Sequence, residues 1–151
     1  MTKTLIPLPV DLADLCIALE SETADYRWYF DLDTGETILL NGEYDPEDHG
    51  GLTKDDIKGR PQRFRRIPAE TPAQALLDMK AFAEQLDDGR LKESLILALA
   101  APRPEKRFRA ALSWLPDELD RWHRFRQALL SERALNWLEA LGVKAIPSEP
   151  N

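Results

Sequence analysis

The sequence predicts an α+β fold in which a small antiparallel sheet, made of a hairpin plus a third strand, packs against four to six helices. Three features of the 151 residues support this prediction. A strand-like aromatic segment leads into a turn at Gly35, apolar residues recur at helical spacing from Thr71 onward, and aromatic residues are concentrated in the last third of the chain. The C-terminal half is therefore expected to be helical.

A first helix is predicted over residues 10–22. Leu12, Leu15, Cys16 and Leu19 follow one another at helical spacings, which places them on one helix face. A reactive cysteine needs a basic neighbour and some exposure, and the surrounding sequence offers neither. Cys16 is therefore predicted to be a core residue, and as a single cysteine it cannot form an internal disulfide.

The clearest hairpin signal lies in residues 26–40. An aromatic segment is followed by a turn that Asp33 opens and Gly35 closes, and a second apolar segment comes after the turn. Aspartate stabilises turns by bonding to nearby backbone, and glycine takes positive φ without strain. Alternation along the first strand places Trp28 and Phe30 on one face, which we expect to meet the core.

Residues 41–59 are predicted to form a polar loop with clustered carboxylates, and residues 62–67 to form the third strand with Phe64 buried. Carboxylate oxygens suit hard cations such as Ca²⁺ or Mg²⁺. The loop and His49 therefore permit a metal-assisted hydrolase as one hypothesis. The loop lacks the ligand spacing of an EF-hand, however, and a solvated acidic loop is the simpler interpretation. No metal and no cofactor are predicted.

Helix signals dominate from Thr71 onward. Thr71 is a predicted N-cap, Pro72 suits the first helical position, and Gln74 is placed to complete a capping box. After a break at Gly89, a second helix is predicted over residues 90–100. Four of its apolar side chains are expected to face inward, namely Leu91, Leu95, Ile96 and Leu99.

Two or three further helices are predicted over residues 105–141, with breaks near Pro116 and Ser131 and an end at Gly142. Aromatic residues in this run follow helical spacing, and large rings bury much apolar area. Four of them are therefore predicted to belong to the core, namely Trp114, Trp122, Phe125 and Trp137.

Composition limits the possible classes of protein. A chain of this length fits one domain, which we place at residues 1–146, followed by a disordered tail over residues 147–151. No apolar stretch approaches the roughly 18 residues of a membrane span. The segment before Asp11 also lacks the apolar core of a signal peptide. A cytoplasmic protein is therefore predicted.

The net charge of −7 is unevenly distributed along the chain. Residues 1–56 carry three basic and fourteen acidic side chains, whereas residues 57–151 carry seventeen basic and thirteen acidic ones. Two interpretations remain open: the two parts neutralise each other in the fold, or a basic face meets an anionic partner. The candidate anion or partner contacts are Arg60, Arg63, Arg65, Arg66, Arg107, Arg109, His123 and Arg124.

Several pieces of the sequence, taken in order, resemble one bacterial family. They are Val10-Asp11-Leu12-Ala13-Asp14-Leu15 with Ala18-Leu19, Tyr29-Phe30-Asp31-Leu32-Asp33-Thr34-Gly35-Glu36, Asp78-Met79-Lys80-Ala81-Phe82, Arg107-Phe108-Arg109, Trp122-His123-Arg124-Phe125-Arg126 and Trp137-Leu138-Glu139. Their order and spacing are similar to those of the uncharacterised protein family numbered 0158, over nearly the whole chain. The resemblance implies a compact α+β domain and assigns no reaction and no catalytic residue.

One link departs from the pattern of that family. Where the resemblance leads us to expect a small glycine-containing connection before Phe108, this chain has Pro102-Arg103-Pro104-Glu105-Lys106. Proline restricts the backbone, so this connection is expected to be stiffer.

Together these observations predict a non-catalytic interaction or regulatory module. No nucleophile elbow, phosphate-binding glycine loop or dinucleotide fingerprint occurs in the sequence, which favours a protein without enzymatic activity. The partner class stays open between a protein and an anionic ligand, and self-association of an acidic with a basic surface is also open. A nucleic-acid-binding regulator that uses the arginines is the first alternative, although the acidic net charge opposes it. The metal-assisted hydrolase is the second.

Overall fold

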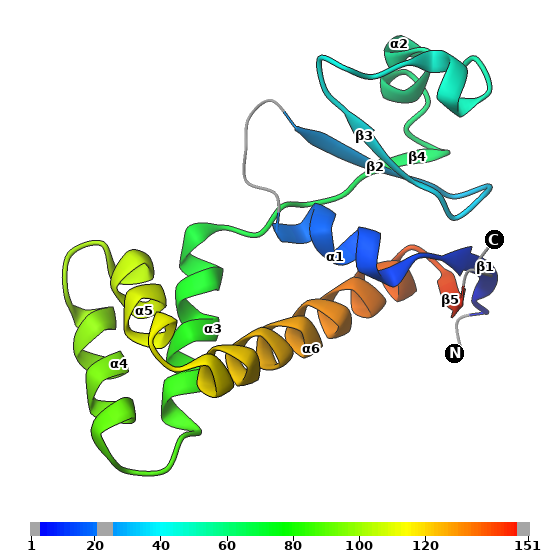
Figure 1. The fold of residues 1–151 in the computed structure, drawn as a ribbon. Coiled ribbons are helices and arrows are strands. Elements are labelled where there is room, and N and C mark those ends of the chain that lie inside the picture. Colours follow the sequence, from blue (N-terminus) through cyan, green and yellow to red (C-terminus); the bar gives the residue numbers. More distant parts are fainter. Residues whose placement is uncertain (1–3, 21–25, 148–151) are drawn as a thin grey trace. The chain divides into compact units, whose positions relative to one another are not determined.

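The predicted combination of a small antiparallel sheet with several helices is confirmed by the computed structural model, which describes residues 4–20 and 26–147 (Figure 1). The chain divides into two compact units: unit 1 comprises Met1–Ala69 and Leu130–Asn151, and unit 2 comprises Glu70–Leu129. The assignment of one domain to residues 1–146 stays a prediction. Of the tail predicted over residues 147–151, Pro147 instead ends a β-strand, and the remainder lies outside the described residues.

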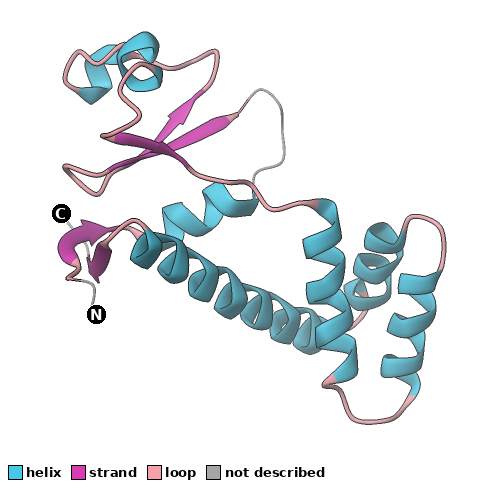
Figure 2. Cartoon of the chain, turned by 180° about the vertical axis from the view of Figure 1, so that it is seen from behind, coloured by secondary structure: helices cyan, strands magenta, loops and turns pink. Residues whose placement is uncertain are grey.

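The elements of each unit follow the chain, and Figure 2 distinguishes helices from strands. Unit 1 contains β1 (Ile6–Val10), α1 (Leu12–Glu20), β2 (Arg27–Asp31), β3 (Thr37–Leu40), the 3₁₀ helix η1 (Pro46–His49), α2 (Lys54–Lys58), β4 (Phe64–Arg66) and β5 (Val143–Pro147). Unit 2 contains α3 (Pro72–Glu84), α4 (Arg90–Ala100) and α5 (Pro104–Ser113). The remaining helix, α6 (Pro116–Ala140), contributes residues to both units.

The three-stranded sheet of unit 1 has the order β3-β2-β4, and both of its neighbour pairs are antiparallel. The predicted turn closes the hairpin, since the Gly35 amide donates to the Asp31 carbonyl at 2.8 Å and Gly35 has φ of 81°. Phe30 is fully buried in one core cluster, against which Trp28 packs, so the predicted core-facing side is confirmed.

The opposite face of this sheet is also covered. Tyr29 and Ile38 pack there with Phe64 of β4, which is buried as predicted, and with Ile57 of α2. The polar composition of residues 41–59 predicts a loop here. A Thr53 capping box starts α2 nevertheless, and the short helix places its one buried side chain on the sheet.

A second sheet, which the sequence analysis did not predict, pairs β1 with β5 in parallel. Pro7 and Pro9 both lie in β1, although proline cannot donate to a ladder. The Ile6 amide donates to the Gly142 carbonyl at 2.8 Å. Since alternate backbone nitrogens in a strand point to opposite edges, both proline nitrogens face away from β5. The strand therefore loses no hydrogen bond of this ladder.

One predicted helix boundary needs correction. The predicted break near Ser131 is wrong, because α6 continues for 25 residues through it. Serine lowers helix propensity only modestly relative to alanine, and neither proline nor glycine interrupts the interior of this helix. Ser131 instead lies against α1, with its Oγ 3.7 Å from the Sγ of Cys16, which is buried as predicted.

Two residues predicted to face the core are exposed. Ile96 exposes 47% of its surface, because α4 packs through Leu95 and Ala98 and this side chain falls beside that face. Trp114 exposes 85%, because it is the C-cap of α5 and stands where the chain leaves one helix for the next.

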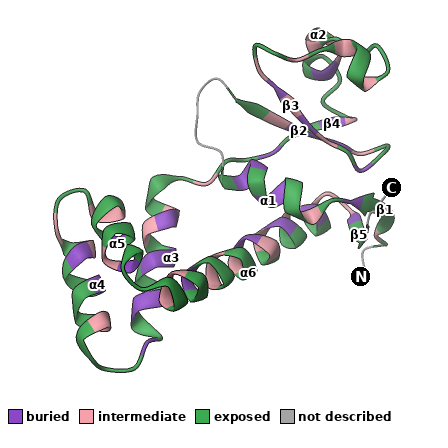
Figure 3. Cartoon of the chain, viewed as in Figure 1, coloured by how far each residue is buried: buried purple, intermediate pink, exposed green. Residues whose placement is uncertain are grey.

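An aromatic cluster forms the core of unit 2, whose helices carry buried residues in Figure 3. The ring of Phe82 lies 5.5 Å from those of Trp122 and Phe125 and 6.3 Å from that of Phe108, in edge-to-face arrangements. Such pairs add to the stabilisation from buried area. The predicted core positions of Trp122 and Phe125 are thus confirmed, and Trp137 packs against the Phe30 cluster of unit 1.

The start of α3 is confirmed in part. The Thr71 side chain accepts from the Gln74 amide at 3.2 Å, as an N-cap does. The Gln74 side chain, predicted to complete the capping box, instead donates to Asp78 at 3.4 Å. Gly142 ends α6 with φ of 83°, as predicted. Across the described ranges, no helix combines the length and the apolarity that crossing a membrane requires.

Candidate functional site

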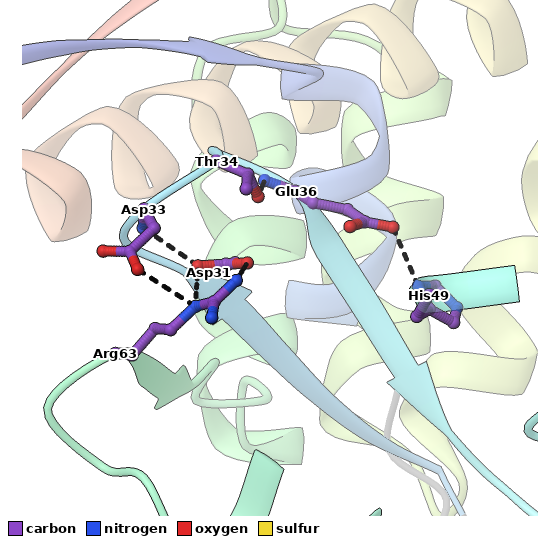
Figure 4. Close-up of polar contacts among 6 residues, drawn as sticks. All are labelled: Asp31, Asp33, Thr34, Glu36, His49 and Arg63. Carbon is purple, nitrogen blue, oxygen red and sulfur yellow. Dashed lines mark hydrogen bonds and ion pairs between the residues drawn. The ribbon is translucent and has the colours of Figure 1, made fainter. Parts of the chain in front are cut away.

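An ion cluster lies beneath the hairpin turn of unit 1 (Figure 4). Arg63 precedes β4 and donates from Nε and Nη2 to the two carboxylate oxygens of Asp31, both at 3.0 Å. Asp33 of the turn lies 3.2 Å from the same Nε, and its amide donates to Asp31 at 2.9 Å. Asp31 is almost completely buried, so the cluster joins the hairpin to the third strand through a bidentate pair.

The charged form of Asp31 is favoured in the folded protein. Burial by itself would raise the pKa of this carboxyl. The hydrogen bonds from Arg63, the Asp33 amide and Thr34, together with the Arg63 charge, outweigh burial and lower the pKa below its ordinary value. The same pairing raises the pKa of Arg63. Arg63 is therefore held by internal acids.

Asp31→Asn is expected to cost about 1–3 kcal/mol at neutral pH, because it removes hydrogen bonds to a charged acceptor. Since the folded pKa of Asp31 lies below the ordinary 3.8, its stabilisation is present above that pH and is lost as pH falls through the folded pKa. Urea unfolding across acidic pH should show a smaller loss of stability for Asp31→Asn than for the natural protein. The exposed neighbour provides the control: Asp33→Asn should keep the natural acid-side loss. An unchanged acid-side loss in Asp31→Asn contradicts the assignment.

A second polar group lies across the hairpin from this cluster (Figure 4). The His49 Nδ1 atom is 2.9 Å from the Glu36 carboxylate, and Tyr44 stacks on the imidazole with ring centroids 5.1 Å apart. The Tyr44 hydroxyl donates to the Leu52 carbonyl at 2.7 Å. Burial and the surrounding carboxylates raise the pKa of Tyr44, the contributing acids being Glu36, Asp56, Asp45 and Asp48.

This group gives the metal hypothesis no support. Within residues 4–20 and 26–147, no three or more histidine, cysteine, aspartate or glutamate residues are placed so that they could hold an ion together. Two of the loop carboxylates have local structural roles instead. Asp45 caps η1, and Asp56 forms the capping box of α2 with Thr53.

The candidate arginines of unit 1 do not share one environment. Arg60 lies 3.8 Å from Asp56 in an exposed pair, and the Arg63 guanidinium is 4.7 Å from the ring centre of Phe64. Arg65 and Arg66 are exposed on the short strand β4, as predicted. Arg60 and Arg63 are therefore paired with acids of the same unit. This agrees with the interpretation that the basic and acidic parts of the chain neutralise each other in the fold.

The other candidates belong to unit 2 or its part of α6. Arg107 donates from Nε to the Pro102 carbonyl at 3.0 Å, and Arg109 forms a 2.6 Å pair with Glu105. His123 and Arg124 are exposed on α6. Arg124 lines a hollow of about 380 Å³ whose other lining residues are Phe82, Gln85, Arg121 and Phe125.

A larger cavity, of about 600 Å³, opens between the first turns of α3 and α5. Its lining consists of Pro72, Leu76, Arg103, Pro104, Glu105, Lys106 and Arg109, and we call it the basic cavity. Within the described ranges, Arg103 is the non-glycine residue with positive φ, at 53°. That is the conformation of glycine, the residue that the family resemblance leads us to expect in this link.

Unit 2 contains a buried ion cluster that was not predicted from the sequence. Arg126 of α6 pairs with both Glu70 and Asp78, and the side chains of these acids are only 8% and 4% exposed. One signal in the sequence pointed to it, since Asp78 lies between Ala75 and Phe82 on the apolar stripe of α3. A charge on such a stripe requires a buried partner.

The fold and these clusters define a class: an α+β protein with two compact units, in which several charged residues hold elements together. The chain belongs to the family described as Uncharacterised protein family (UPF0158), whose model matches residues 5–149. It is similar to a Pseudomonas aeruginosa protein named UPF0158 protein PA5073, with 29% identity over 133 residues, which covers 88% of this chain and 83% of that relative. No solved structure matches the chain.

Proposed function

We propose that this protein is a non-catalytic interaction module of the bacterial cytosol, which docks a protein partner at Trp114. The observation that carries the proposal is the 85% exposure of that side chain. Exposed leucines are common on protein surfaces, but a tryptophan whose side chain is almost fully exposed to solvent is not. Tryptophan contributes large contact area at low entropic cost and is enriched among the residues that dominate binding energy.

The surroundings of Trp114 support the same proposal. Leu115 follows it directly and is 40% exposed, and both lie between α5 and α6, each of which packs into the unit 2 core. The backbone that carries the tryptophan is therefore held between two packed helices, so binding has little backbone freedom to remove there. An apolar anchor of this kind suits a partner with an apolar pocket.

The alternatives receive less support. A nucleic-acid-binding face needs several free arginines together, whereas four of the arginines, Arg60, Arg63, Arg109 and Arg121, lie within salt-bridge distance of acids. The two groups of basic residues also belong to different units. A metal-assisted hydrolase lacks a ligand cluster in the described part of the chain.

Photo-crosslinking inside the source bacterium tests the proposal. A benzoylphenylalanine at position 114 is expected to form a covalent adduct with one protein, identified by mass spectrometry. The same probe at Gln127, an exposed polar position on α6, should not capture it. An adduct with a second copy of the chain would assign the surface to self-association.

The captured protein, once purified, allows a quantitative check. Trp114→Ser is expected to weaken its binding by about 2 kcal/mol, roughly 30-fold, as for other dominant interface residues. The substitution should change the free energy of unfolding by no more than about 0.5 kcal/mol, because the side chain is exposed. If binding is unchanged, or position 114 captures the same proteins as position 127, the docking role of Trp114 is wrong.

A further inference from the structure

We propose that the basic cavity binds an organic phosphate, that is, a phosphate ester with an apolar body. This site goes beyond the proposed docking role of Trp114 and rests on a separate observation. That observation is the meeting of three cationic side chains with an apolar wall in one hollow of unit 2.

The charge around the basic cavity favours an anion. Arg103, Lys106 and Arg109 bring three positive charges to its lining, and Glu105 is the single acid in that lining. The Glu105 carboxylate is occupied by Arg109 at 2.6 Å, so the lining carries a net charge of two positive units. Guanidinium and ammonium groups together suit the several oxygens of a phosphate.

The remaining lining favours an ester over inorganic phosphate. Pro72, Leu76 and Pro104 give the basic cavity an apolar wall, and the volume of about 600 Å³ lies within the usual range for small organic ligands. A free phosphate ion would leave that wall exposed to water. An apolar body attached to the phosphate would cover it and add affinity.

The backbone conformation of Arg103 allows a substitution that removes a charge from the basic cavity without destabilising the fold. Arg103 adopts φ of 53°, which glycine takes without strain and an L side chain does not. Arg103→Gly therefore removes a guanidinium from the basic cavity while relieving the backbone. Its thermal unfolding midpoint should be equal to or higher than that of the natural protein, so lost binding cannot be attributed to unfolding.

The test is a titration of the full chain with phenyl phosphate, followed by amide chemical shifts and by calorimetry. Phenyl phosphate is expected to shift the amides of residues 73–76, 103 and 105–109, and to bind more tightly than inorganic phosphate or phenol. AMP serves as a second phosphate ester. Tighter binding of AMP would point to a nucleotide, and tighter binding of phenyl phosphate to a smaller ester.

Variants then locate the site. Arg103→Gly and Lys106→Gln are each expected to weaken phenyl phosphate binding about tenfold, since each removes a charge-assisted contact. Arg90→Gln, an exposed cation at the start of α4 outside the cavity lining, should bind as the natural protein does. The proposal is overturned by any of three results: no shifts at millimolar phenyl phosphate, shifts elsewhere only, or equal binding by the cavity variants and the natural protein. Equal affinity for inorganic phosphate and phenyl phosphate would overturn the role of the apolar wall.

Discussion

Gly35→Ala is expected to destabilise the protein by about 3–5 kcal/mol, because the new methyl group meets backbone and the residue keeps a left-handed conformation. A Cβ at this position would lie 2.0 Å from the Pro9 carbonyl oxygen and 3.5 Å from the Leu8 Cβ. A carbonyl cannot rotate away as a flexible side chain can. Either β1 or the hairpin turn must shift, and chemical denaturation should report the loss as a lower midpoint.

A second glycine separates the two causes of that loss. Gly50 also has positive φ, at 65°, but no atom lies within 4 Å of a Cβ built on it. Gly50→Ala should therefore cost only the backbone strain, about 1–2 kcal/mol. Equal losses in the two variants would mean that close packing of the hairpin turn against β1 contributes nothing, contrary to the structure.

Arg126→Met is expected to destabilise unit 2 by about 3–5 kcal/mol. The substitution preserves much of the apolar stem but leaves the carboxylates of Glu70 and Asp78 buried without the guanidinium that pairs with both. Removing one partner of a buried pair costs far more than the pair contributes, because the remaining charge is still desolvated. Urea unfolding, read out by tryptophan fluorescence, measures the difference.

The same substitution on an exposed pair of the same helix is the matched control. Arg121 lies 3.2 Å from Glu118, and both side chains are partly in water, so Arg121→Met should cost less than about 1 kcal/mol. Neutralising the acids as well, in Arg126→Met with Glu70→Gln and Asp78→Asn, should recover much of the loss. A small effect of Arg126→Met, similar to that of Arg121→Met, would show that the pairing is not structural.

Several features were predictable because they depend on neighbouring residues. The turn at Gly35, the Thr71 cap and the apolar face of α1 follow from local backbone chemistry and helical periodicity. The family likeness was also visible in the order of short sequence pieces. The predicted break at Ser131 is wrong because a weak local preference does not end a helix whose residues on both sides of that position pack into core clusters.

The placement of charged and aromatic residues was not predictable in the same way. Helical spacing predicts that Trp114 is a core residue. It is the C-cap of α5, however, and a side chain at the end of a helix can be exposed even when the rest of that helix face is buried. Charge counts did not reveal that Arg63 and Arg126 are held by acids 32 and 48 residues away in the chain. Such pairs form only when the fold brings distant segments together.

The sequence by itself determined the α+β class, the hairpin with its third strand, and the start of the helical half, because these depend on turn chemistry and periodicity within a few residues. The tertiary structure alone decided the pairing of β1 with β5, the arginines bound by internal acids, the exposure of Trp114 and the basic cavity. These features depend on how residues distant in sequence are placed in the fold. The stabilising energy of a contact depends on how far burial removes its groups from water, and that burial cannot be read from a local sequence pattern.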